Sequence, residues 1–192
     1  MSEESFRGFV AVPSPGPLLS RLKNLQQELK QLELDAKWVA LEQIHLTVKF
    51  LGQTPSSILE SIKASLDKIA QEHPAFSFPV DRFGVFPNAR EPRILWVGSS
   101  EASSPLQKLT VSLEDAMHEL GFVKEKRDFK GHLTLARLRT PKQSYRLQDW
   151  MHKHPISWRE EFPCERLILF QSTLTPKGSI YQPLHSSLLR EP

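Results

Sequence analysis

The chain has 192 residues, a formal net charge of +3 and a sequence pI near 9.0. Its hydrophobic fraction of 39% and charged fraction of 24% are those of a folded protein and exclude a disordered chain. A chain of this length predicts a single two-lobed domain over residues 1–192, with a core that needs no disulfide or metal to hold it. The weak positive charge permits an anionic partner without identifying it.

Signals for secretion, membrane insertion and disulfide formation are missing from the sequence. The acidic start, Met1 to Glu4, has neither the basic nor the apolar region of a signal peptide. The longest apolar runs fall well short of the roughly 18 residues of a membrane span. Cys164 is the single cysteine, which excludes an internal disulfide and a thiolate zinc cluster. We expect a cytoplasmic protein that does not associate with membranes, and we expect it to be a monomer.

Helical and strand periodicities alternate along the chain. Leucines at helical spacing from Leu18 to Leu32 predict the first helix, and Ser103 or Ser104 and Gly121 are typical of the two ends of a later one. In chain order the sequence predicts a strand at 6–12, a helix at 18–34, strands at 37–40 and 44–51, a helix at 56–70, strands at 76–85 and 93–97, a helix at 104–120, a strand at 132–138, a helix at 141–151, and strands at 156–162, 166–174 and 180–184. Because strands often follow one another directly, the order favours an α+β domain with antiparallel or mixed sheets over a doubly wound parallel sheet.

Two segments nearly half the chain apart share one pattern. His45-Leu46-Thr47-Val48 and His132-Leu133-Thr134-Leu135 both place His-apolar-Thr-apolar at the start of a predicted strand. A repeat of that length indicates an internal duplication into two lobes rather than a solenoid. Since side chains alternate along a strand, the His and Thr of each segment share one face, and the apolar residues face the core.

Two imidazoles that face each other across a groove suit acid–base chemistry. One ring, neutral, accepts a proton while the other, charged, donates one. Threonine hydroxyls donate hydrogen bonds to an anionic oxygen, so a phosphodiester fits between the two pairs. Taken singly, His45 or His132 is more often a structural residue, but chance seldom produces two such strands in one chain.

The sequence resembles the two-histidine phosphoesterases, and among them the RNA 2′,3′-cyclic phosphodiesterases, also called 2′-5′ RNA ligases. The likeness covers nearly the whole chain. It is carried by the segments Arg7-Gly8-Phe9-Val10-Ala11-Val12, His45-Leu46-Thr47-Val48-Lys49-Phe50-Leu51-Gly52, Pro92-Arg93-Ile94-Leu95-Trp96-Val97-Gly98, Phe129-Lys130-Gly131-His132-Leu133-Thr134-Leu135-Ala136-Arg137 and Tyr181-Gln182-Pro183-Leu184. Gly131 departs from the family, which often has Pro before the second His.

This resemblance implies a bilobal, pseudo-twofold α+β fold in which two mostly antiparallel sheets flank a central cleft, with helices on the outside. It implies hydrolysis of RNA 2′,3′-cyclic phosphate ends to 2′-phosphates without a metal or other cofactor, and reversible 2′-5′ ligation when a 5′-hydroxyl replaces water. Carried onto this chain, His132 resembles the proton acceptor and His45 the proton donor, while Thr47 and Thr134 resemble the phosphate-binding residues.

Further substrate contacts are expected at Lys130, Arg137 and Phe129, each with a plain structural alternative. Arg137 follows His132 at an odd offset, so strict alternation puts it on the opposite face unless a bulge or a strand end turns it. The basic loop before the second motif attracts a phosphate backbone, and Phe129 stacks on a base or packs into the core. Lys49 either shares the face of Thr47 or serves the structure.

Two other functions stay open at this point. One is a different two-histidine phosphodiesterase, which acts on cyclic ADP-ribose phosphate or trims RNA ends with another regiochemistry. The other is an RNA- or nucleotide-binding module without catalysis, which predicts salt-dependent binding and no turnover. Two intact proton-transfer groups argue against the second.

Overall fold

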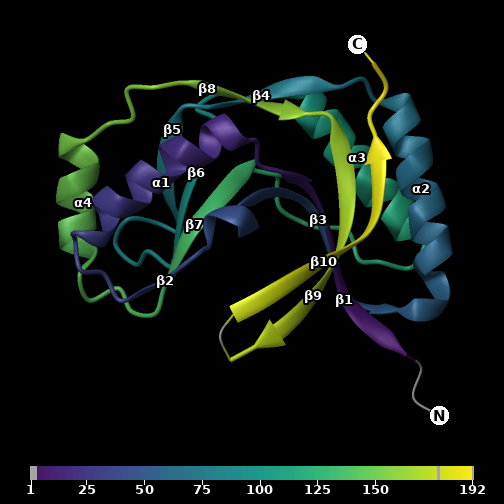
Figure 1. The fold of residues 1–192 in the computed structure, drawn as a ribbon, viewed down its shortest axis with the longest axis horizontal. Coiled ribbons are helices and arrows are strands. Elements are labelled where there is room, and N and C mark those ends of the chain that lie inside the picture. Colours follow the sequence, from purple (N-terminus) through teal and green to yellow (C-terminus); the bar gives the residue numbers. More distant parts are fainter. Residues whose placement is uncertain (1–3, 177, 192) are drawn as a thin grey trace.

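The computed structural model describes residues 4–176 and 178–191 (Figure 1). Its elements in chain order are β1 (Ser5–Pro13), α1 (Gly16–Lys30), β2 (Ala36–Trp38), the 3₁₀ turn η1 (Leu41–Gln43), β3 (His45–Pro55), η2 (Ser56–Ile58), α2 (Leu59–Glu72), β4 (Phe76–Val80), β5 (Arg82–Phe86), β6 (Ile94–Gly98), α3 (Ser104–Glu119), β7 (His132–Leu138), α4 (Ser144–Lys153), β8 (Glu160–Cys164), β9 (Arg166–Thr175) and β10 (Gly178–Leu188). The predicted α+β class is confirmed.

Two antiparallel sheets form the domain. The larger has eight strands in the order β10-β9-β1-β3-β7-β6-β5, with β2 paired to β7 beside this path, and the smaller consists of β4 and β8. In Figure 1, α2 and α3 lie at one end of the molecule and α1 and α4 at the other. Each end of the large sheet therefore has its own pair of helices, as expected for two lobes.

The two halves of the large sheet meet where β3 and β7 pair. Their ladder contains the single residue pair Leu46–Leu133, and further along β7 the same edge is taken by β2. Gln26 of α1 lies behind this junction, where its side-chain amide donates to the carbonyls of Val39 (2.9 Å) and Leu135 (3.0 Å). The junction is thus a narrow seam in which a helix side chain adds hydrogen bonds to backbone carbonyls beside the single strand pair.

Leucine-rich helix faces build the core behind the sheet, as the periodicity predicts. Leu18, Leu22 and Leu29 of α1 and Leu46 and Leu133 of the seam are all buried in one hydrophobic cluster. Burial of such side chains contributes about 1.5–3 kcal/mol each. No helix in the described part of the chain has the length and apolar character needed to cross a bilayer.

Several element boundaries follow local chemistry. Ser103 accepts a hydrogen bond from the amide of Leu106 and caps α3, and Gly121 ends it at a φ of +91°. The first helix begins at Gly16, earlier than expected, because Pro17 is tolerated in a first helical turn. It ends at Lys30, earlier than its leucine spacing indicates.

The expected single strand at 76–85 is wrong, since it is two strands in different sheets. β4 pairs with β8, whereas β5 pairs with β6 in the large sheet. Asp81 lies at the crossing, where its amide donates to Gly98 and its carboxylate accepts from Ser100. The last helix and β8 also start later than predicted, at Ser144 and Glu160.

Candidate active site

The two His-Thr pairs come together on one face of the large sheet. Leu46 and Leu133 point into the core with no exposed surface, so the half-buried His45, Thr47, His132 and Thr134 point the other way. Continuing the antiparallel Leu46–Leu133 register by one residue in each direction sets Thr47 beside His132 and His45 beside Thr134. The four side chains therefore form one cluster across the seam.

Each imidazole is oriented by a carbonyl two residues before it. His45 Nδ1 donates to the carbonyl of Gln43, and His132 Nδ1 donates to that of Lys130, both at 2.7 Å. A carbonyl only accepts, so Nδ1 carries the proton in both rings. This leaves Nε2 of each histidine to accept or donate a proton at a ligand.

Aromatic rings wall each imidazole. Phe9 stacks on His45 with centroids 5.0 Å apart, and Tyr181 meets it edge-on at 5.3 Å. Phe86 contacts His132 edge-on at 5.0 Å. These rings cover part of each imidazole and restrict its orientation.

Trp96 also lies beside His132, at 6.2 Å between ring centroids. Its indole covers Gly84 so closely that a Cβ atom at this position would collide with the ring. Only glycine therefore allows the indole to take this place next to the imidazole.

Burial lowers the pKa of both histidines below the ordinary 6.5. For His45 and His132, loss of hydration is the largest cause, and the carbonyl hydrogen bonds oppose it. The positive charge of Arg137 lowers both pKa values further, and that of His132 lowers the pKa of His45. The three groups are thus close enough to interact electrostatically, and addition of an anion between them favours the protonated rings.

Both motif strands contain a β-bulge directly after the threonine. The register of β3 against β1 skips Val48, and that of β7 against β6 skips Leu135. Burial along His45–Leu51 follows the same sequence of half-buried, buried and exposed positions as along His132–Leu138. The duplication seen in the sequence is therefore a duplication of backbone shape.

The bulge decides where Arg137 points. With Leu135 looped out, Arg137 pairs with Ile94, two residues from the Trp96 that faces Thr134. Arg137 is accordingly exposed on the face of the histidines, which agrees with its lowering of their pKa values. Strict alternation, which assigns it to the opposite face, fails here.

Lys49 does not share the face of Thr47. It is 5% exposed, and its ammonium group donates to Glu114 of α3 at 2.6 Å and to the carbonyl of Val123 at 3.1 Å. The bulge at Val48 turns Lys49 to the buried side, where it ties β3 to α3 and to the loop before the second motif. Of the two roles left open by the sequence, the structural one is correct.

Phe50 is a site candidate that the sequence reasoning did not single out. It is the Cα partner of Phe9, so it shares the histidine face, yet it is 67% exposed. Its place in β3 matches that of Arg137 in β7. The signal was available in the second half of the first motif, but only the bulge shows which way the ring points.

The remaining candidates lie around the cluster. Neither Thr47 nor Thr134 has a side-chain hydrogen-bond partner among the described residues, so both hydroxyls are available to a ligand. Lys130 is exposed, whereas Phe129 is half-buried and packs against the core. Gly131, the residue before His132, is packed so closely that a Cβ atom there would lie 2.7 Å from Leu106.

Other parts of the molecule offer no rival centre. In residues 4–176 and 178–191, no group of three or more His, Cys, Asp or Glu is placed to hold a metal ion. Cys164 is buried, which raises the pKa of its thiol to about 12 and makes it unreactive. Two surface hollows, of about 520 and 450 Å³, lie beside α1, and neither is lined by a residue of the two motifs. The site is identified by its chemical groups rather than by a cavity.

Comparison with known proteins agrees with this geometry. The model of the family LigT like Phosphoesterase matches residues 12–96. An RNA 2′,3′-cyclic phosphodiesterase of Archaeoglobus fulgidus is 33% identical, over 93% of this chain and 97% of that protein. The enzyme of the same name from Methanocaldococcus jannaschii is 30% identical, over 92% and 96%.

Solved structures show the same fold. The crystal structure of TT0787 of Thermus thermophilus has a TM-score of 0.79 at 27% identity and covers 96% of this chain and 98% of its own. E. coli LigT complexed with 3′-AMP has a TM-score of 0.75 at 21% identity, over 97% and 99%. Two motif strands, one fold and relatives matched along almost their whole length lead to one assignment: the chain belongs to the LigT-like phosphoesterases, in the family of the RNA 2′,3′-cyclic phosphodiesterases.

Proposed function

We propose that this protein hydrolyses 2′,3′-cyclic phosphate ends of RNA to 2′-phosphomonoesters by two-histidine acid–base catalysis. The observation that carries the proposal is the pairing of β3 and β7, which sets His45 and His132 on one face with a threonine beside each. The family and the names of its relatives support the same reaction. We expect the enzyme to act as a monomer in the cytoplasm, which sedimentation and cell fractionation test.

The reaction needs one proton removed and one supplied. His132 Nε2 takes a proton from water as the water oxygen bonds to phosphorus. The bond from phosphorus to the 3′-oxygen breaks, and His45 Nε2 gives its proton to that oxygen. The products are a 2′-phosphate and a 3′-hydroxyl, and the two imidazoles have exchanged charge states. The Nδ1 hydrogen bonds keep both rings in the required orientation.

Charge on the phosphate is balanced by groups of both strands. The hydroxyls of Thr47 and Thr134 donate to its non-bridging oxygens, and Arg137 supplies a fixed positive charge on the same face. In this proposal each requirement of the step is assigned to a residue of this chain. The exposed ring of Phe50 is placed to stack on a base of the substrate.

The test is a time course with cytidine 2′,3′-cyclic phosphate and assignment of the product phosphate. A 2′-phosphate formed at an undiminished rate in EDTA is expected. A 3′-phosphate would exclude the proposed regiochemistry, full inhibition by the chelator would indicate a metal enzyme, and saturable binding without turnover would indicate a binding module.

The pH dependence is a second test. One histidine must be charged and the other neutral, so kcat/KM should follow a bell. Because the pKa values of both His45 and His132 lie below 6.5, the optimum for the free enzyme is expected below pH 6.5. A profile that rises steadily above that pH would contradict the assignment of these two groups.

A further inference from the structure

Two cations stand opposite each other beside the His-Thr cluster. Lys37 of β2 and Arg137 of β7 are Cα partners, and directly opposed residues of an antiparallel pair project to the same face. Since Arg137 lies on the histidine face, Lys37 lies there as well. Both side chains are exposed.

The pair contrasts with the charges just beyond the end of the same ladder. Two residues further on, Arg139 meets Asp35, with a backbone hydrogen bond of 2.8 Å and an ion pair at 3.3 Å. Between Lys37 and Arg137 the charges are alike, which destabilises a cross-strand pair. Within residues 4–176 and 178–191, neither forms an ion pair with a carboxylate. This is the arrangement expected where an anion from outside the chain completes the charge balance.

The Lys37 side chain reaches towards the other half of the site. A Cβ atom placed on Gly178 would be 3.7 Å from the Lys37 ammonium, so this group lies at the tip of the β9–β10 hairpin. Gln43 fixes that tip by donating to the carbonyl of Ser179 at 2.7 Å, and Tyr181 of the same hairpin contacts His45. The ammonium therefore lies at the end of a hairpin that also contacts His45, and it belongs to neither His-Thr pair.

We propose that Lys37, together with Arg137, binds the phosphate that precedes the terminal cyclic phosphate of an RNA strand. The inference rests on the proposed function, because the terminal phosphate must occupy the His-Thr cluster. RNA carries its phosphates in succession, and a cyclic mononucleotide has none beyond the reacting one. Lys37 thus makes the enzyme favour oligonucleotide ends over mononucleotides.

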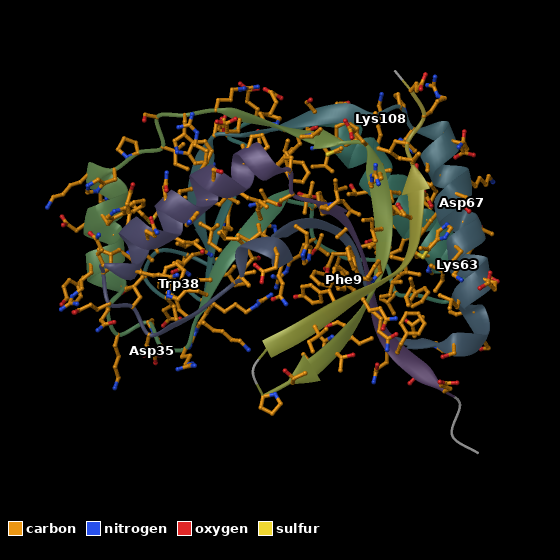
Figure 2. All side chains as sticks on the ribbon, viewed as in Figure 1. Phe9, Asp35, Trp38, Lys63, Asp67 and Lys108 are labelled. Carbon is orange, nitrogen blue, oxygen red and sulfur yellow. The ribbon has the colours of Figure 1, made fainter. Side chains whose placement is uncertain are left out.

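Steady-state kinetics of Lys37→Gln test this inference. With a dinucleotide ending in a 2′,3′-cyclic phosphate, kcat/KM should fall about tenfold, the value of one hydrogen bond to a charged group. The loss on cytidine 2′,3′-cyclic phosphate should be clearly smaller, and Lys37→Arg should retain most of the dinucleotide activity. The matched control is Lys108→Gln, because Figure 2 shows Lys108 at α3, far from the β9–β10 hairpin.

A neutral linkage isolates the contact. When the internal phosphate of the dinucleotide is replaced by a methylphosphonate, kcat/KM of wild type should fall about tenfold. The same replacement should change kcat/KM of Lys37→Gln only slightly, because this variant already lacks the contact. Equal losses in both proteins, or an equal loss of the variant on the mononucleotide, would overturn the inference.

Failure of the proposed function has a different signature. In that case wild type either hydrolyses none of the three substrates or releases a 3′-phosphate from them. Calorimetric binding of a dinucleotide ending in a 2′-phosphate then tests Lys37 without turnover, and equal affinities of wild type and Lys37→Gln would overturn the inference there too.

Discussion

The segments His45–Leu51 and His132–Leu138 have the same backbone shape and different surroundings. Both alternate, bulge after the threonine and resume, so that corresponding residues have corresponding burial. Yet the fifth residue after each histidine is Phe50 in one and Arg137 in the other. The duplicated backbone supplies the symmetric proton-transfer groups, and unmatched side chains at equivalent places give one half an aromatic surface and the other a cationic one.

The largest effect is expected where the two strands are alike. His45→Ala and His132→Ala should each lower kcat on a cyclic nucleotide by about 10²–10⁴, because each removes one proton-transfer group. The double variant should lose less than the product of the two losses, since the groups act together.

Exposed His152 of α4 provides the matched control, and His152→Ala should behave as wild type. Near-normal turnover by His45→Ala or His132→Ala would contradict the assignment of a proton-transfer role to each histidine.

The next effect concerns the cationic half. Arg137→Gln should reduce kcat/KM by about 10², as for loss of one charge-stabilising donor. Because the charge of Arg137 lowers the pKa of His45 and of His132, its removal should also move the pH optimum upwards.

Arg139→Gln is the control for Arg137, since this neighbouring cation is already paired with Asp35. An unshifted pH profile in Arg137→Gln would mean that Arg137 does not act on the imidazoles.

Substitutions in the aromatic half should have smaller effects, and these should depend on the nucleobase of the substrate. Phe50→Ala is expected to lower kcat/KM about tenfold, the value of one stacking contact, while Phe50→Trp should stay near wild type. With a ribose 2′,3′-cyclic phosphate that has no base, wild type and both Phe50 variants should have the same kcat/KM.

Val111→Ala on α3 is a suitable control for Phe50, because Val111 is similarly exposed. An equal loss of Phe50→Ala on the base-free substrate would contradict stacking.

The smallest effect on turnover is expected at Lys49, which has the buried Ala136 as its counterpart in β7. Lys49→Met should lower the free energy of unfolding by about 1–2 kcal/mol, less than for a fully buried pair because Glu114 is partly exposed. Urea denaturation measures this change, and Glu114→Gln in the same chain should recover part of it. A loss of activity comparable to that of the histidine variants would place Lys49 in the reaction instead.

The sequence predicts the parts of this molecule that follow regular periods. The strand 132–138, the capped helix after Ser103 and the pairing of each His with its Thr on one face were all readable, because each follows from spacing or from one capping residue. Positions beyond a bulge were not readable. Val48 and Leu135 are ordinary strand residues, and nothing local marks them as looped out. Hence only the structure shows that Lys49 points to the buried side and that Phe50 is exposed on the face of the histidines.

The amide of Gln26 has a consequence for how this chain can change. It approaches the seam from the helix side and occupies the carbonyl of Leu135, the very residue that the bulge displaces. A shorter side chain there would remove this donor from the carbonyl of Val39 and leave the carbonyl of Leu135 with the amide of Val39 as its partner, which weakens the hold on the looped residue. Substitution of Gln26 in α1 would then change the orientation of Arg137, two residues after Leu135, although α1 lies on the other side of the sheet from the histidines. Selection for catalysis would therefore also act on this helix.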